Sequence, residues 1–455
     1  MGYGLAEHMT FKRLLKAAFP CILMMVAISI YSVVDGFFLS NFAGKAPFAA
    51  VNLIYPVIMV LATMGFLMGA GGSALVSKRF GQGKDEEGNI YFSNCVFFSI
   101  SIGIVASVLV FIFLPDIALL LGADEEMLPL CVLYGRILVV GSTAFNLQNL
   151  FQSFFTAAEK PQLGTFVTLL AGVVNIVLDA ILIAGFHLGI LGAAIGTVAG
   201  QVIGAAIPFV YFTRKNPSRL RLRLHAFHFK AIAKMVSNGS SEFATNISAS
   251  AVSMVMNVGL MEYYGQNGVG AYGTICYVWM IFAAVFIGYN IAVAPRIAYA
   301  LGAGEKAELR NLFHKSLIML AIFGVTMFAL SAALSVPVSY IFGGYDEGLQ
   351  KLTAYGSLLY SFTYISLGIS MFGSCFFTAL NNGLVSFLLS YFRLGVIEIA
   401  CVMVLPIAFG GDAVWVAVPV AEFLGSCVNI AVMTLFAKKY GYSKEQIDEQ
   451  EDDQD

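Results

Sequence analysis

Charged residues are scarce in this chain. Asp, Glu, Lys and Arg make up 11 % of its 455 residues, whereas about 25 % is usual in a globular domain. So few charges could not cover the surface of a water-soluble protein of this length. Hydrophobic residues supply 59 % of the sequence, and the excess must face lipid. We therefore expect an integral membrane protein embedded in the lipid bilayer.

Metal-binding and disulfide patterns are also missing. The seven cysteines are odd in number and stand in apolar stretches, and the five histidines lie at or beyond the ends of such stretches. No HExxH sequence occurs, so the residues predict neither a disulfide framework nor a catalytic metal site. The formal net charge of −2 leaves no basic surplus for nucleic acid. We expect no prosthetic group and no nucleic-acid partner.

Long apolar runs are abundant instead. Twelve runs are long enough to span the membrane as helices, which takes about 20 residues each. They are unbroken rather than alternating, so they predict helices and not the strands of a barrel. The first run starts at Leu14 and is too long for a cleaved signal peptide. The expected fold is an all-α integral membrane protein with twelve transmembrane helices.

The basic residues predict an orientation. The N-terminus, the even-numbered loops and the C-terminus hold 21 of the 25 Lys and Arg residues, and the positive-inside rule places all of them in the cytoplasm. A basic connector at 214–230 separates an N-terminal lobe, 1–213, from a C-terminal lobe, 231–440. The acidic segment 441–455 has no apolar periodicity and predicts a disordered cytoplasmic tail. We expect a multi-pass protein of a prokaryotic plasma membrane, with both termini cytoplasmic.

The two halves repeat each other. FGQGK at Phe80–Lys84 recurs as LGAGE at Leu301–Glu305, and Ala158–Phe166 recurs as Ala379–Phe387. Both pairs of segments are separated by one constant distance along the chain, which we call the repeat spacing, without a gap. Each half holds an even number of spans, so both enter the membrane in the same direction. The halves should therefore form two six-helix lobes related by a pseudo-two-fold axis along the membrane normal. Transporters use this arrangement, although a channel or a membrane enzyme could also be duplicated.

This layout, together with V-D-G-F-F in the first helix (Val34–Phe38) and the paired G-x-G loops, resembles the multidrug and toxic compound extrusion (MATE) family. The resemblance covers about residues 10–440 and is closest to the bacterial MepA-like branch. It implies a monomer with a V-shaped pair of lobes. These lobes would export small amphipathic, often cationic organic compounds by alternating access, in exchange for H⁺ or Na⁺.

Four polar residues break the repeat. They are Asp35, Asn175, Asp179 and Thr197. At the repeat spacing their counterparts in the second half are Met256, Val396, Ala400 and Val418, all of which are apolar. Counted along their helices, the two aspartates and the threonine lie roughly 9–12 Å below the outer surface at ~1.5 Å per residue. The asparagine lies one turn deeper. We expect these side chains to form one layer in the first lobe.

This layer predicts a coupling site. Two carboxylates close together repel each other, so they share a proton or hold a cation between them. Carboxylate, amide and hydroxyl oxygens suit a hard cation. The one metal ion that we expect is therefore Na⁺, bound at Asp35 and Asp179. The alternative is a hydrogen-bond network that joins the first, fifth and sixth helices. The resemblance adds that such a set looks like the cation site of the family's N-terminal lobe.

The second lobe carries its own intramembrane charges. Glu398 and Glu422 are candidates for a second coupling site, or one of them neutralises Arg393. Within the fourth helix, Asn149 and Gln152 belong to an amide stripe that either lines a substrate cavity or packs between helices. No acid occupies the middle of the seventh helix or the tenth, where a branch of the MATE family carries them.

The function predicted from these patterns is cation-coupled export. A flippase for lipid-linked saccharides, from the same broad superfamily, would need a more cationic cavity than Arg136 and Arg393 provide. An integral membrane enzyme would need a nucleophile or His/Asp set that the sequence lacks. The sequence does not exclude a channel. Transport of substrate against its gradient would distinguish a carrier from a channel.

Overall fold

Every regular element of the described chain is helical. The computed structural model describes residues 4–38, 45–125, 127–343 and 346–443, so the predicted acidic tail lies outside the described residues from position 444 onward. The first half contains α1 (Phe11–Phe38), α2 (Lys45–Gly81), α3 (Asp85–Leu120), α4 (Met127–Ala157), α5 (Pro161–Asp179), the π-helical η2 (Ala180–Gly185) and α6 (Ile190–Thr213). The second contains α7 (Phe229–Ala303), α8 (Lys306–Gly343), α9 (Glu347–Ser361), α10 (Thr363–Ala379), α11 (Gly383–Ser390), the π-helical η3 (Tyr391–Glu398), α12 (Ile399–Phe409) and α13 (Ala413–Tyr440).

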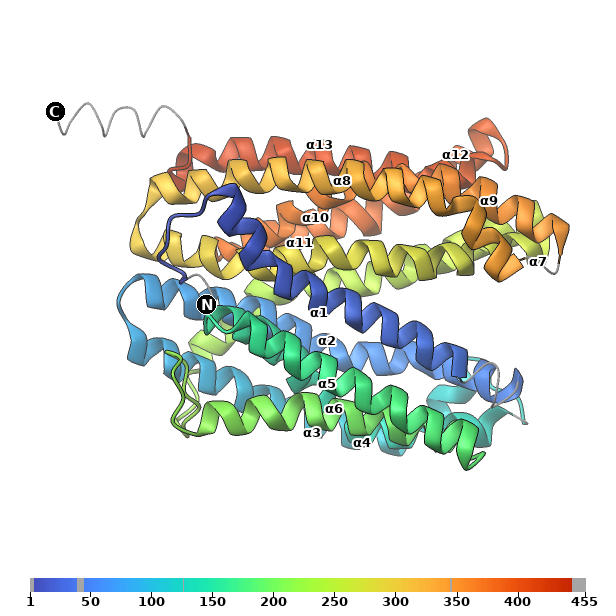
Figure 1. The fold of residues 1–455 in the computed structure, drawn as a ribbon, viewed down its shortest axis with the longest axis horizontal. Helices are drawn as coiled ribbons and strands as arrows, with labels where there is room; N and C mark the ends of the chain where they lie inside the picture. Colours follow the sequence, from blue (N-terminus) through green and yellow to red (C-terminus); the bar gives the residue numbers. More distant parts are fainter. Residues whose placement is uncertain (1–3, 39–44, 126, 344–345, 444–455) are drawn as a thin grey trace.

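These elements make twelve membrane crossings. Ten helices, with α11, η3 and α12 counted as one, are long and apolar enough to cross alone, and α9 and α10 form a further span bent by 47°. The 75-residue α7 is two helices merged across Gly265, whose φ of 62° and ψ of −149° interrupt the helix. The predicted all-helical fold with two lobes of six spans is confirmed. Figure 1 shows α1–α6 in one part of the molecule and α7–α13 in the other.

The lobes meet where helix backbones approach closely. Gly81 packs on α7 so tightly that a Cβ there would overlap the Tyr299 carbonyl oxygen, and a Cβ at Gly302 would overlap the Lys78 carbonyl oxygen. Gly302 is the repeat partner of Gly81, and Tyr299 is that of Lys78, so the same contact is made twice. The pseudo-two-fold axis therefore passes through this crossing of α2 and α7.

The repeat spacing does not hold everywhere. It relates the positive-φ glycines Gly83 and Gly304, and also Gly189 and Gly410. At the turn before α5 and α11, however, the positive-φ residues are Glu159 and Asn381, which stand one position further apart than the repeat spacing. The prediction of a gap-free repeat is wrong at this turn. The turns themselves have equal lengths, 158–160 and 380–382, so the extra position lies before the turn, where the bent pair α9 and α10 stands in place of the continuous α4.

One end of the molecule gathers most of the basic segments. We call it the basic end: it holds the N-terminus, the turns at 82–84 and 304–305, and the connector 214–228. In the connector, Leu220 and Leu222 are buried while Arg219, Arg221 and Arg223 are exposed. The Leu222 N–H donates to the Phe212 carbonyl at 2.8 Å. The alternating RLRLR sequence thus holds the chain against the lobe by its leucines and presents its arginines outward.

An N-terminal strap, residues 4–10, joins the two lobes at the basic end. The Leu5 N–H donates to Glu159 Oε1 at 2.8 Å in the first lobe. On the second lobe, the Met9 N–H donates to Glu308 Oε1 at 3.0 Å and His8 Nδ1 lies 2.5 Å from Glu308 Oε2. Lys315 Nζ donates to the Met9 carbonyl at 2.7 Å. The strap therefore links the α4–α5 turn to α8.

Candidate coupling site in the first lobe

Small residues bring α1, α5 and α6 close together. A Cβ at Gly172 of α5 would lie 2.9 Å from the Tyr31 ring of α1. On α6, a Cβ at Gly200 would lie 2.9 Å from the Ala171 carbonyl oxygen, and one at Gly196 would overlap Asp179 Oδ1. Such small-residue contacts let membrane helices approach closely. They also seat the Asp179 carboxylate directly on the α6 backbone.

The structure brings the predicted coupling residues together. The Asp35 and Asp179 carboxyl groups lie within electrostatic range of each other. Asp179 is completely buried at the end of α5, and Asn175 is buried one turn before it. Thr197 follows Gly196 on α6 and is half-buried. Asp35, Asn175 and Asp179 are thus brought together from α1 and α5, and Thr197 lies next to the α6 glycine that contacts Asp179.

Their oxygens lack protein donors. Among the described residues, no hydrogen-bond partner lies near the buried oxygens Asp35 Oδ1, Asn175 Oδ1, Asp179 Oδ1 and Oδ2, and Thr197 Oγ1. A buried polar group without a partner costs about 1–3 kcal/mol. A structural network would have paired these atoms with one another's donors. These four residues therefore leave buried oxygens unpaired in one region of the first lobe.

The helix geometry changes at this point. The π-helix η2 begins at Ala180, immediately after Asp179. π-helical turns are rare and occur mostly at functional sites. The carboxylate of Asp179 therefore lies at the junction between α5 and this π-helix.

Tyrosines surround the carboxyl pair, although the sequence pattern did not single them out. Tyr31, Tyr55 and Tyr134, from α1, α2 and α4, lie within electrostatic range of Asp35. Tyr277 of α7 approaches from the other lobe: its hydroxyl oxygen would lie 3.9 Å from a Cβ at Gly36. The sequence could have indicated one of these tyrosines. Tyr31 lies one helical turn before Asp35 and therefore shares its helix face.

The charged residues of the second lobe form a separate cluster. Arg393 Nη1 donates to Glu422 Oε1 at 2.8 Å, and both side chains are buried. This is the neutralising pair that was one of the two predicted alternatives. Glu398 lies within electrostatic range of both partners, and its Oε2 has no hydrogen-bond partner among the described residues. Glu242 of α7 also lies within range of Arg393.

The amide stripe of α4 is buried against its neighbours. Asn146 Oδ1 accepts a hydrogen bond from the Gly65 N–H of α2 at 2.9 Å, and Gln148 packs over Gly204 of α6. These two amides join helices. Asn149 Nδ2 and Gln152 Nε2 are buried without a hydrogen-bond partner among the described residues. These two amides have donors left for a substrate.

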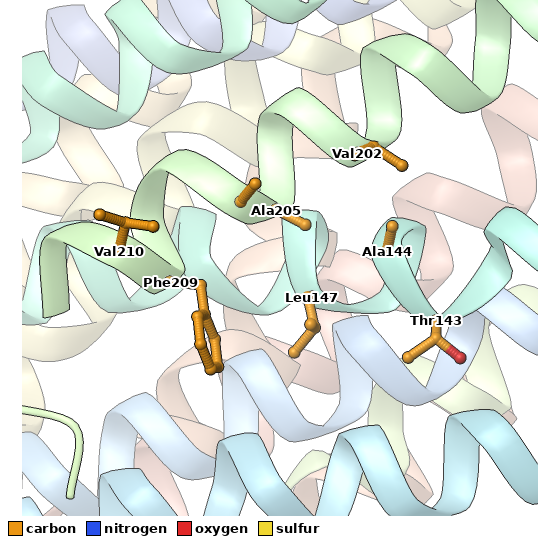
Figure 2. A pocket seen from close by; sticks show the side chains of 8 residues that line it. Thr143, Ala144, Leu147, Val202, Ala205, Phe209 and Val210 are labelled. Atoms are coloured by element: carbon orange, nitrogen blue, oxygen red, sulfur yellow. The ribbon is translucent and has the colours of Figure 1, made fainter. Parts of the chain in front are cut away.

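A groove beside the stripe is apolar. Figure 2 shows it between α4 and α6, with a volume of about 370 Å³. Its lining consists of Thr143, Ala144, Leu147, Val202, Ala205, Ala206, Phe209 and Val210. Thr143 supplies the polar atom, and neither Asn149 nor Gln152 reaches the groove. It therefore lies apart from the polar donors of α4.

A sequence model of the MatE family matches both halves, at residues 20–181 and 243–404. The two matches have the same length, so both halves carry the family pattern. At the repeat spacing, or with the one extra position found at the turn before α11, the positions opposite Asp35 and Asp179 fall within 256–257 and 400–401, which contain no acid. The two carboxylates therefore have no acidic counterpart in the second lobe.

Known transporters resemble the chain in sequence and in fold. Multidrug export protein MepA of Staphylococcus haemolyticus strain JCSC1435 is 26 % identical over 324 residues, which cover 70 % of this chain and 71 % of the relative. The same protein of Staphylococcus aureus strain MSSA476 is 25 % identical over 331 residues, covering 72 % and 73 %. A structure described as the outward-facing conformation of a multidrug resistance MATE family transporter superposes with a TM-score of 0.90 at 18 % identity, covering 96 % and 98 %. A transporter of the MOP superfamily from Pyrococcus furiosus gives 0.89 at 18 %, covering 95 % and 97 %. The chain belongs to the MatE family of multidrug efflux transporters.

Proposed function

We propose that this transporter exports small amphipathic organic cations in exchange for H⁺ or Na⁺, which binds between Asp35 and Asp179. The observation that carries the proposal is the convergence of buried oxygens without donors on α1, α5 and α6. The relatives described as multidrug export proteins support export of drugs. No covalent step is involved, so the chain acts as a carrier and needs no cofactor beyond the coupling ion.

The carboxyl pair can couple ion binding to lobe conformation. A bound positive charge offsets the repulsion between the carboxylates, so the conformation that holds them together is favoured when the ion is present. A ligand shifts a conformational equilibrium only by its differential affinity for the two states. Exchange of one monovalent organic cation for one H⁺ or Na⁺ moves no net charge, so the concentration gradient of the coupling ion drives it. A tenfold ion gradient supplies about 1.4 kcal/mol, enough for a roughly tenfold concentration ratio of substrate.

We infer that the basic end faces the cytoplasm, because it carries the positive residues that the positive-inside rule retains there. The Gly81–Tyr299 and Gly302–Lys78 contacts and the N-terminal strap all join the lobes at this end. The state described is therefore closed toward the cytoplasm. We infer a single chain as the functional unit, in a prokaryotic plasma membrane.

The arginines favour drug export over saccharide-lipid flipping. A pyrophosphate-linked substrate would need free guanidinium groups in the central space. Arg136 instead stacks on Phe111 with 4.9 Å between its Cζ and the ring centroid. Arg393 is engaged by Glu422. These two residues supply no free cationic patch.

The test is drug efflux from proteoliposomes under a pH gradient or a Na⁺ gradient, each imposed alone. Asp35→Asn and Asp179→Asn keep the size of the side chain but cannot exchange a proton or balance a cation. We expect each variant to lose gradient-driven accumulation while still binding drug in detergent. Asp116→Asn is the matched control, because Asp116 is an exposed aspartate on α3.

The gradient that drives efflux in the native protein identifies the coupling ion. Near-normal gradient-driven efflux by the Asp35→Asn/Asp179→Asn double variant would contradict the proposal. A pure loss of thermal stability, with coupling retained in the protein that still folds, would instead assign the four residues to a structural network.

A further inference from the structure

The basic connector lies between the ends of α3 and α6. The Arg221 N–H donates to Asn89 Oδ1 of α3 at 2.7 Å, and Asn89 Nδ2 donates back to the Arg219 carbonyl at 3.1 Å. The residue between them in the pattern of contacts, Leu222, donates its N–H to the Phe212 carbonyl of α6 at 2.8 Å. The connector is thus fixed to both helices and bridges the gap between them at the basic end.

The arginines of the connector have no acidic partners. The segment 214–230 contains six basic residues and no acid. Arg219, Arg221 and Arg223 are exposed, and no ion pair joins them to another residue in the described part of the chain. Because buried leucines alternate with them, the three arginines lie on one side of the connector. They form a row of positive charge that attracts an anionic ligand.

Exposed apolar side chains follow the arginines. Leu224 is 85 % exposed, and Phe227 and Phe229 are also exposed, with 6.2 Å between their ring centroids. Apolar side chains exposed beside a basic segment are typical of a membrane-binding surface. A water-soluble anion would gain nothing from them. This part of the connector therefore favours a lipid over a soluble ligand.

The apolar groove between α4 and α6 ends close to the connector. Val210 lies at one end of the groove, and Thr143 and Val202 lie at the other (Figure 2). The Arg214 N–H donates to the Val210 carbonyl at 3.2 Å, so the connector begins one helical turn beyond the groove. Figure 1 shows α6 on the side of the first lobe that faces away from α8–α13. The groove therefore opens toward lipid and leads to the basic connector.

We propose that this surface binds one anionic phospholipid of the cytoplasmic leaflet. Its phosphate lies on Arg219, Arg221 and Arg223, and one of its acyl chains lies in the groove between α4 and α6. The cytoplasmic leaflet carries anionic lipids, and a cluster of Lys and Arg residues directly after a transmembrane helix attracts them. The proposal rests on the inferred cytoplasmic position of the basic end and is independent of the coupling site.

Native mass spectrometry of the purified protein measures the affinity of each bound lipid. Phosphatidylglycerol and phosphatidylcholine with identical acyl chains are added separately. We expect one phosphatidylglycerol to bind about tenfold more tightly than phosphatidylcholine, and Arg221→Gln/Arg223→Gln to abolish this preference. Lys12→Gln/Lys16→Gln is the matched control, because it removes two exposed positive charges at the same end. Equal affinities for the two lipids in the native protein, or an equal loss in the control, would overturn the proposal.

A second variant tests the groove. Ala206 is exposed and lines the groove, so the ring in Ala206→Phe fills it without entering the core. We expect this variant to bind phosphatidylglycerol about tenfold more weakly, because the acyl chain loses its apolar contacts. Ala321→Phe, at an exposed position of α8, should leave the affinity unchanged. An Ala206→Phe protein with native affinity would contradict the placement of the acyl chain.

Glycerol 3-phosphate separates a lipid site from a site for soluble anions. It carries a phosphate but no acyl chain, so we expect it not to displace phosphatidylglycerol at equal concentration. Displacement would refute the lipid site. Asp35→Asn, which loses coupling under the antiport proposal, should bind phosphatidylglycerol as the native protein does. Lipid binding and coupling can therefore fail independently, and each result bears on one proposal only.

Discussion

At Gly196 the lack of a side chain decides how the coupling site is built. The α6 backbone passes so close to Asp179 Oδ1 that no Cβ fits between them. The carboxylate is consequently fixed against α6 while Asp35 approaches from α1. A glycine with no chemical function of its own thus sets the separation of the two acids.

Gly196→Ala should therefore impair coupling. The added methyl group pushes Asp179 away from α6, so the oxygens no longer converge, and we expect gradient-driven efflux to fall as far as in Asp179→Asn. In Gly259→Ala, a Cβ meets no atom within 4 Å, and transport should be unchanged. Efflux assays and thermal unfolding of both variants check this. A Gly196→Ala protein that transports normally would show that the acids tolerate displacement.

The repeat allowed four site residues to be predicted from the sequence, but it hid others. Asp35 and Asp179 stood out because no acid occupies the corresponding position of the second half. Tyr55 was not singled out, because nothing in the sequence places α2 beside α1. Tyr134 could not be placed either, since its approach to the carboxyl pair depends on how α4 packs. Helix spacing predicts faces, whereas contacts between helices need the packed structure.

Among the helical elements, α7 departs most from a simple span. Its two halves cross the membrane in opposite directions and meet at Gly265, in a conformation open to glycine but not to other residues. Tyr264, the preceding residue, donates a hydrogen bond to Asp412 at the start of α13. The turn is therefore fixed both by its backbone and by a contact with the last helix.

We expect Gly265→Ala to destabilise the protein by about 1–3 kcal/mol, the usual cost of a side chain in such a conformation. No atom lies near a Cβ at this position, so the effect is one of backbone strain. Gly273→Ala is the control, because position 273 is an exposed helical site where a Cβ meets nothing. A fall in melting temperature for the first variant only, in the same detergent, is the expected result. Equal melting temperatures would contradict it.

At the scale of the whole molecule, the two lobes are held together at the basic end by the crossing of α2 and α7. Glycines at this crossing let the two helix backbones touch directly. Gly81 and Gly302 each lie on the carbonyl of the partner helix. The N-terminal strap bridges the same end through Glu159 and Glu308. Further close approaches join α2 and α7 beyond this crossing, because a Cβ at Gly71 would overlap the Met235 carbonyl oxygen and one at Gly239 the Leu67 carbonyl oxygen.

Gly81→Val should open this end. The larger side chain cannot fit over the Tyr299 carbonyl, so the equilibrium shifts away from the closed state. Spin labels at the exposed positions 162 and 384, in a cysteine-free background, report the distance between the lobes. We expect a longer distance in Gly81→Val and no change in Gly259→Val. An unaltered distance would mean that the crossing does not hold the lobes together.

The doubled contact between Gly81 and Gly302 also bears on how the protein arose. A contact that a surface makes with its own symmetry mate is the isologous interface of a homodimer. A six-helix ancestor could thus have dimerised through this crossing before its gene was duplicated and fused. In that dimer every substitution occurred in both subunits. Fusion let the two copies diverge, so that one half now carries Asp35 and Asp179 and the other carries Glu398 beside Arg393.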